Sequence, residues 1–411
     1  MVRESTSRAR DPVSGDPEGN GTVLRILHVV TLLTPDNAYG GPLRVAVNQV
    51  RELRAQGHEV DLVAGVSGFH RIPETVDGVE IRLFPVANLV PGTGFAGLLS
   101  WRMLRYLVRN MRTYDVVHVH LARDLVTLPA AALALLWRRA YVLQTHGMID
   151  ASDRRLAKVL DFFITRAVVG RAKAVLYLTE LEKDSLASLF GLSSAMLTPL
   201  PNGVPLTQCR GTKSEVLDVL YLARLQARKR PMEFLKAAKE IGPGISETTA
   251  RFSLVGPDEG EGTSVKAFIA TLPDSPPVVL EGPLGPDETL ARMESAAIYV
   301  LPSVDEPFPM SVLEAMSVGL PVVITKSNGL APFVERHAAG IVIDVNEGAL
   351  AAPLRMLMQD AEMRERMGEN ARRAASEHFS IAAVAKQLHL VYMNIAKSSS
   401  GTRRFMIGAE S

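Results

Sequence analysis

The 411-residue chain is poor in cysteine and has no long apolar segment. Cys209 is its single cysteine, so a disulfide framework is excluded and a reducing, cytoplasmic setting is favoured. The longest apolar run, residues 125–137, contains Pro129 and falls short of the roughly 18 residues that a membrane-spanning helix needs. Residues 1–22 lack the apolar core of a secretory signal and are predicted to be a disordered lead-in. We therefore expect a cytoplasmic protein, either soluble or peripheral at the inner face of a membrane.

Several motifs of cofactor and metal chemistry are also missing. Neither half of the chain carries G-x-G-x-x-G after its first predicted strand, which argues against a dinucleotide dehydrogenase. There is no D-x-D, no H-E-x-x-H and no cysteine–histidine cluster, so we expect no metal site and no cofactor. The net charge of +1 gives no indication of nucleic-acid binding.

What the chain does have is a regular alternation of nearly continuous apolar runs and amphipathic segments. This pattern is typical of parallel sheets covered by helices on both faces, and the chain is too long for one compact core. We predict an α/β fold of two tandem Rossmann-like, doubly wound domains, residues 23–203 and 204–379, with the first linker in the Pro/Gly-rich stretch at 196–206. A further helix is predicted at 380–396 and a flexible tail at 397–411.

The most informative stretch is residues 302–321, PSVDEPFPMSVLEAMSVGLP. An apolar strand precedes it, two prolines force a tight loop, and a helix is predicted from Met310. Free amides and the helix dipole converge at such a helix start and favour anions. Glu306 and Glu314 lie at this place, either as surface acids or as acceptors of hydrogen bonds from a polyhydroxylated ligand.

The E-x7-E spacing in EPFPMSVLEAMSVGLPVV resembles the signature of glycosyltransferase family 4, the group 1 glycosyltransferases, which are retaining enzymes of the GT-B fold. The resemblance implies that Glu306 contacts hydroxyls of the donor sugar and that Glu314 contacts the ribose of the nucleotide. It also implies donor contacts from Phe308, Met310 and Ser311 in the same motif.

Two further implications concern the ends of this pattern. Pro309 stands where the family more often has glycine; proline lacks an N–H, which leaves the identity of the donor sugar open. The helix at 380–396 resembles the terminal helix of the family, which crosses back onto the first domain. The two domains and this helix together make the resemblance cover nearly the whole ordered chain.

Arg224 and Lys229, five residues apart, follow the first predicted strand of the second domain. Ligands bind at the carboxyl ends of strands in open α/β sheets, so both cations could reach one diphosphate; a basic surface loop is the alternative. The stretch is similar to the family's G-R-x4-K-G, with Ala223 and Arg230 in place of the two glycines. The resemblance implies that Arg224 and Lys229 hold the donor pyrophosphate and stabilise the leaving nucleotide diphosphate.

Other candidates lie at strand ends of the first domain. Gly40 and Gly41 let a ligand approach the backbone or form an ordinary turn; in the family such glycines abut the donor phosphate and the acceptor. His146, in Thr-His-Gly, is either structural or donates to a sugar hydroxyl or phosphate, and the resemblance implies that it lies opposite the donor sugar. His118 and His120 share one face of a strand, and His120 is the acceptor-side candidate.

Gly256 and Leu284 follow two later strands, where the family usually cradles the base; simple turns are the alternative. We expect four residues to carry the catalysis: His146, Arg224, Lys229 and Glu306. The family's front-side displacement retains configuration and uses the departing phosphate as base, and it requires no metal here if the two cations and the helix dipoles supply the positive charge.

Residues 100–175 hold 13 basic and 5 acidic residues, a local excess of +8. Arg102, Arg105, Arg109 and Arg112 recur there at helical spacing beside apolar side chains. Such a surface could rest on anionic lipid, and a solvated helix face is the alternative.

The sequence therefore predicts a retaining, metal-independent hexosyltransferase. It would move a sugar from a nucleotide-diphosphate sugar to a hydroxyl of a glycan or lipid-linked acceptor, by analogy in envelope polysaccharide or glycolipid synthesis. An epimerase-like enzyme that acts on the donor alone and a non-catalytic nucleotide-sugar-binding subunit are the alternatives. The base, the sugar, the acceptor and the oligomeric state stay open.

Overall fold

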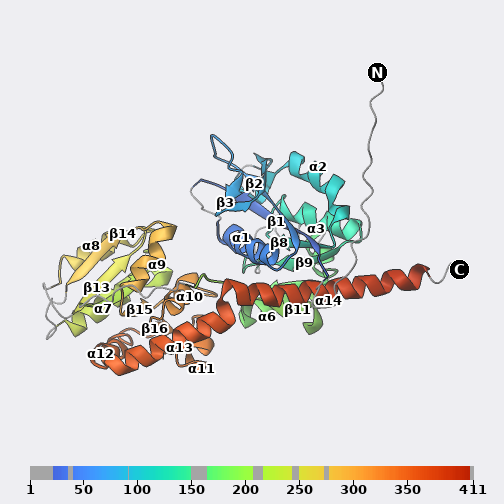
Figure 1. The fold of residues 1–411 in the computed structure, drawn as a ribbon. Coiled ribbons are helices and arrows are strands. Elements are labelled where there is room, and N and C mark those ends of the chain that lie inside the picture. The colour runs from blue at the N-terminus through green and yellow to red at the C-terminus, as the bar shows by residue number, and fades with distance from the viewer. Residues whose placement is uncertain are drawn as a thin grey trace, which may run out of the picture.

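Two parallel β-sheets form the two halves of the molecule (Figure 1). The computed structural model describes residues 22–35, 40–90, 92–149, 164–206, 216–242, 250–272 and 277–407. The predicted lead-in at 1–22 lies almost wholly outside these residues. Within them, no helix is long and apolar enough to cross a membrane.

The N-terminal sheet has seven parallel strands in the order β11-β10-β9-β8-β1-β2-β5. Their bounds are β1 (Arg25–Leu33), β2 (Glu59–Val66), β5 (Arg82–Pro85), β8 (Val116–His120), β9 (Ala140–Gln144), β10 (Ala174–Tyr177) and β11 (Leu197–Pro199). Two short antiparallel pairs flank it: β3 (Thr75–Val76) with β4 (Val79–Glu80), and β6 (Ala87–Asn88) with β7 (Leu98–Leu99). The predicted linker at 196–206 thus begins with a strand of this sheet.

The C-terminal sheet has six parallel strands in the order β14-β13-β12-β15-β16-β17. Their bounds are β12 (Leu217–Leu222), β13 (Ala250–Val255), β14 (Val278–Gly282), β15 (Ile298–Leu301), β16 (Val322–Thr325) and β17 (Gly340–Ile343). In both sheets the chain starts in the middle, builds outward and then reverses, so the switch points lie between β1 and β8 and between β12 and β15. Ligands of doubly wound sheets bind at these points, beyond the carboxyl ends of the strands.

Helices cover both faces of each sheet, as the continuous apolar strands predict. In the N-terminal domain, α1 (Gly40–Ala55) packs on one face and α2 (Trp101–Asn110), α3 (Thr127–Leu136), α5 (Arg166–Val169) and α6 (Glu180–Phe190) on the other. In the C-terminal domain, one face carries α7 (Pro231–Ile241), α8 (Gly262–Ile269) and α12 (Ala351–Gln359). The other carries α9 (Pro286–Glu294), α10 (Met310–Ser317), α11 (Ala331–Arg336) and α13 (Ala361–Phe379).

The last helix, α14 (Ile381–Ile407), leaves the C-terminal domain and runs beneath the N-terminal one (Figure 1). It completes the core on the α1 face with four apolar side chains: Val384, Leu388, Tyr392 and Ile395. The crossing helix is therefore confirmed. Its predicted end at residue 396 is too early, because the backbone stays helical to Ile407, where the sequence predicted a flexible tail. Extending an existing helix adds one hydrogen bond per residue, whereas starting one is costly.

The two segments that join the domains are bonded to each other. Val204 donates its backbone N–H to the carbonyl of Phe379 (2.8 Å), and Ile381 donates to the carbonyl of Val204 (3.2 Å). Gly203 lies so close that an added Cβ would be 2.8 Å from Cα of Ile381. The chain thus crosses between the domains twice at one place.

Candidate active site

A cleft of about 490 Å³ lies between the domains. The N-terminal domain contributes the first turns of α1 and the loop after β9, the crossing segment contributes Asn202 and Gly203, and the C-terminal domain contributes the start of α10. The side-chain oxygen Oδ1 of Asn202 is buried here and has no hydrogen-bond partner within the described residues. A cleft that unites both domains and contains an unsatisfied polar atom is suited to a ligand that touches both.

A second cavity of about 230 Å³ lies at the carboxyl ends of β12 and β13. Its lining is mostly apolar with a few polar groups: Leu222, Ala223, Arg224, Lys229, Val255, Gly256, Pro257, Leu284, Thr289 and Ser311. Gly256 has a φ of +144°, and an added Cβ would lie 2.0 Å from the carbonyl oxygen of Ala223. Glycine is therefore needed for the two loops to meet, and Gly256 lines the cavity together with Leu284.

Glu306 and Lys229 form a buried ion pair at the C-terminal side. Lys229 Nζ donates to Glu306 Oε2 over 2.5 Å, and Nη2 of Arg228 lies 3.5 Å from the same oxygen. Desolvation lowers the pKa of Lys229, and the Glu306 carboxylate partly offsets that effect. Because Lys229 lies in a short 3-10 helix, residues 227–229, and Glu306 follows β15, the pair joins the two central strand ends of the domain.

Glu314, in α10, faces the cleft with only 7% of its surface exposed. Nη2 of Arg44, in the first turns of α1, lies 3.8 Å from its Oε1, so this pair spans the two domains at a distance too long for a hydrogen bond. Burial raises the pKa of Glu314, and Arg44 partly offsets the rise. The carboxylate therefore has acceptor capacity to spare in the cleft.

Arg224 lies at the mouth of the smaller cavity and is half-exposed. Its Nη1 donates to Oε1 of Glu259 over 2.9 Å, and Gln226 donates to the other oxygen over 3.3 Å. The cation is thus held by a carboxylate before any anion arrives.

His146 follows β9 and lines the cleft. It has a φ of +52°, and the buried carboxylate of Glu182 fixes the loop on both sides by accepting from Thr145 Oγ1 (2.5 Å) and from the N–H of Gly147 (2.6 Å). Burial lowers the pKa of His146 to about 3, so the ring is neutral at pH 7. Its Nε2 lies 2.8 Å from Nδ1 of His120.

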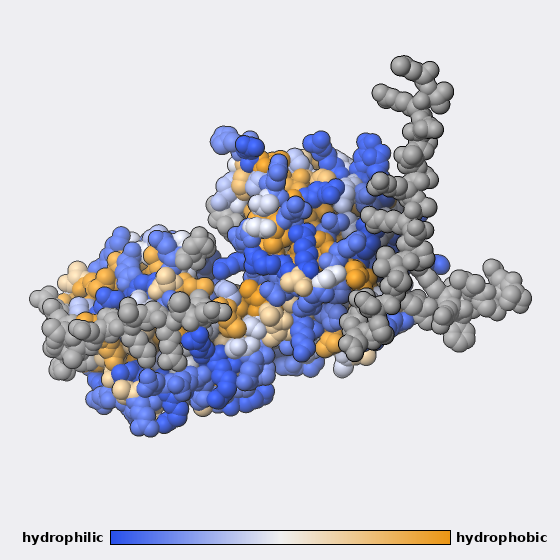
Figure 2. All heavy atoms as spheres, viewed as in Figure 1, coloured by the Kyte–Doolittle hydropathy of each residue, from blue (hydrophilic) through white to orange (hydrophobic). Residues whose placement is uncertain are grey.

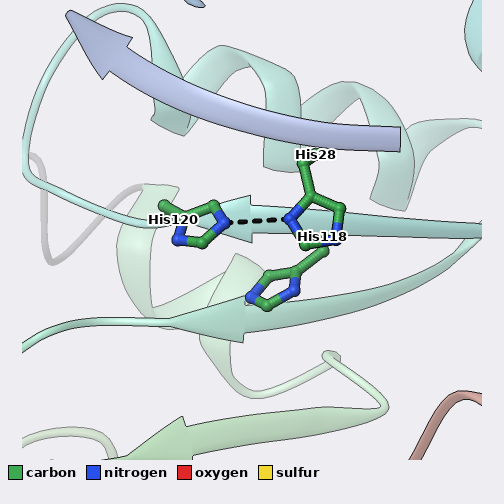
Figure 3. A group of neighbouring side chains, drawn as sticks. All are labelled: His28, His118 and His120. Carbon is green, nitrogen blue, oxygen red and sulfur yellow. Dashed lines mark hydrogen bonds between the residues drawn. The ribbon is translucent and has the colours of Figure 1, made fainter. Parts of the chain in front are cut away.

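The acceptor-side prediction for His120 needs correction. His118 and His120 do share a face, and their rings stack with centroids 4.5 Å apart. That face, however, is fully buried against α14, where His118 and His120 lie beside His28 of the neighbouring strand β1 (Figure 3). His120 Nδ1 lies 2.8 Å from His146 Nε2, and His120 does not line the cleft. Alternation along a strand predicts a shared face but not which side the rest of the chain covers.

The remaining predicted residues lie around the two cavities. Gly40 and Gly41 open α1, and an added Cβ at Gly41 would meet no atom within 4 Å, so a ligand has room there. Tyr39, beside them, lies outside the described residues. Met310 lines the cleft and Ser311 the smaller cavity, whereas Phe308 packs edge-to-face on Phe379 at the crossing to α14.

Four residues of this site were not predicted from the sequence: Arg44, Glu182, Asn202 as a cleft residue, and Glu259. Arg44 and Glu259 meet their partners only through tertiary contact, and Glu182 is one of several acids in an amphipathic helix. The one usable signal was the Asn-Gly pair at 202–203 in a Pro/Gly-rich stretch.

Two doubly wound domains with a cleft between their strand ends are the arrangement of the GT-B fold, and the comparisons agree. Residues 39–208 match the family model described as Glycosyltransferase Family 4, and residues 209–374 match the one described as Glycosyl transferases group 1. The chain belongs to these glycosyltransferases.

Its relatives include the D-inositol 3-phosphate glycosyltransferase of Corynebacterium kroppenstedtii, 24% identical over 95% of this chain and 93% of the relative. The enzyme of the same name from Corynebacterium diphtheriae is 26% identical over 90% and 93% of the two chains. Among solved structures, a glycosyltransferase from Rickettsia africae has a TM-score of 0.72 at 16% identity, covering 92% of this chain and 100% of the other. Anabaena HepE in complex with UDP and glucose has a TM-score of 0.64 at 18% identity, covering 89% and 98%.

Proposed function

We propose that this glycosyltransferase moves a sugar, with retention of configuration, from a nucleotide-diphosphate sugar to a hydroxyl of a glycan or lipid-linked acceptor. The observation that carries the proposal is Glu314, a buried carboxylate in the cleft with Arg44 at 3.8 Å. A desolvated carboxylate with free acceptor positions is stabilised by hydroxyl donors, and the two hydroxyls of a ribose supply them. The small, mostly apolar cavity beside it has the character of a base-binding pocket.

The reaction then follows from the charges around the cavity. Lys229 and Arg224 receive the diphosphate and stabilise the negative charge that develops as the sugar–phosphate bond breaks. The amino end of α10 adds the positive end of a helix dipole. Glu306, held by Lys229, accepts from sugar hydroxyls, and the departing phosphate takes the proton of the acceptor hydroxyl. In this proposal no metal ion is required, and turnover should be insensitive to chelators.

The first test is a thermal-shift panel with UDP, GDP and ADP on the wild type, on Glu314→Ala and on the control Glu335→Ala, whose side chain is exposed on α11 of the same domain. We expect one nucleotide to stabilise the wild type and the control, and to stabilise Glu314→Ala at least tenfold less effectively in ligand concentration. No shift with any nucleotide at millimolar concentration would contradict the donor site.

Turnover then separates the two alternatives from a transferase. A nucleotide sugar on the preferred base should be consumed only when an acceptor is present. Conversion of the donor alone into an epimer would indicate the epimerase-like enzyme. Binding without any conversion over a panel of glycan and lipid-linked acceptors would favour the non-catalytic subunit.

A membrane acceptor fits the outer face of α2. Arg102, Arg105 and Arg109 are exposed there, together with Trp101 and Val108. An apolar groove of about 320 Å³ lies between α2 and α3, and Figure 2 shows apolar residues gathered on the visible face of this domain. We propose that this face rests on anionic lipid, as in envelope glycolipid or polysaccharide synthesis at the cytoplasmic side of a membrane.

Vesicle flotation tests the membrane proposal directly. The wild type should float with vesicles containing anionic phosphatidylglycerol and not with neutral ones, and the triple charge removal Arg102→Gln, Arg105→Gln and Arg109→Gln should abolish flotation. The matched control removes three exposed arginines of the other domain: Arg336→Gln, Arg366→Gln and Arg373→Gln. Absence of flotation of the wild type with anionic vesicles would refute the proposal.

A further inference from the structure

Three histidines and one tyrosine connect the core of the N-terminal domain to the histidine in the cleft. His28 lies in β1, His118 and His120 lie in β8, and Tyr392 reaches them from α14; all four side chains are fully buried (Figure 3 shows the histidines). His120 contacts His146, which lines the cleft. Buried polar side chains are usually stabilised by hydrogen bonds, and these four side chains bond to one another.

The contacts form one continuous chain. Tyr392 Oη lies 3.1 Å from His28 Nε2, His28 Nδ1 lies 3.1 Å from His120 Nε2, and His120 Nδ1 lies 2.8 Å from His146 Nε2. Tyr392 Oη also lies 2.6 Å from His118 Nδ1. Each histidine inside the chain therefore uses both ring nitrogens, one on either side.

Neutral rings leave such a chain only two arrangements. Burial is the largest cause that lowers the pKa of each of these histidines, so each ring has one N–H and one lone pair. Every link then contains one proton, and reversing one ring requires reversing all of them. The end at Tyr392 decides which nitrogen of His146 carries hydrogen.

The two contacts of Tyr392 Oη differ in length, and the difference indicates to which histidine the tyrosine O–H donates. Hydrogen bonds given by O–H are typically shorter than those given by N–H. The 2.6 Å contact is therefore the tyrosine O–H donating to His118 Nδ1, and the 3.1 Å contact is His28 Nε2–H donating to the tyrosine oxygen. His118 then carries its proton on Nε2, a buried atom that has no hydrogen-bond partner within the described residues.

The rest follows by elimination along the chain. His28 donates from Nε2, so its Nδ1 accepts from Nε2–H of His120. Nδ1 of His120 in turn accepts from Nε2–H of His146. Nδ1 of His146 is left with a lone pair, and the loop that Glu182 fixes holds this ring at the cleft.

We propose that Tyr392, His28 and His120 are positioning residues that hold His146 as the Nε2–H tautomer, so that its Nδ1 accepts a hydrogen bond from a ligand hydroxyl. This rests on the proposed function, in which the cleft holds a sugar and an acceptor hydroxyl. It replaces the expectation that His146 donates, and it means that His146 contacts a hydroxyl and not a phosphate oxygen. The crossing helix α14 thereby sets the chemistry of a cleft residue in the other domain.

A metal ion is the rival occupant of these side chains. Nitrogen atoms of His28, His118 and His120 lie within 4.8 Å of one another. A divalent cation would need a lone pair from each ring, so it would remove the proton between His28 and His120 and break the chain.

The experiment is long-range ¹H–¹⁵N correlation on the full chain with ¹⁵N-labelled histidine rings, near pH 7.5. The nine histidines are assigned from single histidine-to-glutamine variants. We expect the Nε2–H pattern for His146 in the wild type and a mixture of both tautomers in Tyr392→Phe. The matched control is Tyr141→Phe, which removes another buried hydroxyl of this domain, the one that donates to the carbonyl of Val168.

Activity and nucleotide binding give the second readout. Tyr392→Phe should lose about tenfold in kcat, the equivalent of one hydrogen bond, and keep the wild-type thermal shift with the preferred nucleotide. An Nδ1–H pattern for His146, an unchanged tautomer in Tyr392→Phe, or stoichiometric Zn²⁺ shifting the three buried rings would overturn the proposal. If no nucleotide binds either protein, the proposed function is contradicted. The tautomer of His146 is still decided by the NMR experiment, which needs no nucleotide.

Discussion

The two domains share the order of their central strands yet build opposite kinds of site. At the switch point of the N-terminal sheet, neutral imidazoles are bonded in a chain beneath the cleft. At the switch point of the C-terminal sheet, Lys229 and Glu306 form a buried ion pair, with Arg224 and Glu259 beside it. The same order of central strands thus supports a chain of neutral histidines in one domain and a buried ion pair in the other. The side chains at the strand ends decide which kind of site forms.

Breaking the ionic side should have the largest effect. Lys229→Ala removes the cation nearest to the proposed diphosphate, so kcat should fall at least 100-fold. It also leaves buried Glu306 with only the half-exposed Arg228, at 3.5 Å, as a counter-charge, which should cost about 3 kcal/mol of unfolding free energy in urea titrations. The double variant Lys229→Ala, Glu306→Gln should recover stability and not turnover.

The control for Lys229 is Lys326→Ala. Lys326 also pairs with a carboxylate, Asp344, but lies exposed on the surface of the same domain. It should keep wild-type turnover and stability. Loss of less than tenfold in Lys229→Ala would show that this cation does not stabilise the leaving group.

Acid should lower the stability of the N-terminal domain first, because this domain contains the chain of neutral histidines. The pKa of each chain histidine is lowered in the folded protein and near 6.5 in the unfolded chain, so below about pH 6.5 only the unfolded state takes up their protons. Stability is complete above that pH and falls as pH drops, by up to about 1.4 kcal/mol per pH unit for each histidine. Glu314 acts with the opposite sign, because its raised pKa lets the folded state hold a proton.

Tryptophan fluorescence measures this effect in one domain. Both tryptophans of the chain, Trp101 and Trp137, lie in the N-terminal domain. The urea midpoint they report should drop clearly between pH 7.5 and 5.5, and the exposed variant His70→Gln should show the same drop. Equal midpoints at the two pH values would mean that the buried rings are not neutral.

The smallest effect should come from Glu259→Gln. Glu259 holds Arg224 in the empty site, so removing its charge should tighten binding of the preferred nucleoside diphosphate about twofold by calorimetry, a small gain because the pair is exposed. Glu240→Gln, which breaks a similarly exposed pair with Arg355, is the control. Weaker binding in Glu259→Gln would show that Glu259 positions Arg224 instead of competing for it.

The two-domain pattern and most of the charged residues at the C-terminal domain's site could be predicted from the sequence, because each depends on local spacing. The strand–loop–helix at Glu306 and Glu314 and the loop from Arg224 to Lys229 are short, continuous segments. Arg230 shows the reach of such reasoning: it stands where the family has glycine, and its φ is +53°. That conformation costs a non-glycine residue about 1–2 kcal/mol, and a bond to the carbonyl of Val345 (2.8 Å) helps to hold it.

The neutral side could not be predicted in the same way. His120 and Tyr392 both contact His28, but they lie 92 and 364 positions from it in the sequence. No local sequence pattern relates residues that are so far apart. The Arg44–Glu314 contact likewise depends on how the two domains meet. Such residues become visible only when the fold brings their elements together.

The paired crossing at Val204 has a mechanical consequence. Two domains joined by a single segment can rotate about any axis. Here two crossing segments lie side by side, held by the hydrogen bonds of Val204 to Phe379 and Ile381. Rotation about the line between the two segments is therefore the motion that meets the least resistance. A rotation about that line would leave Asn202, next to it, nearly in place and would displace the rims of the cleft furthest.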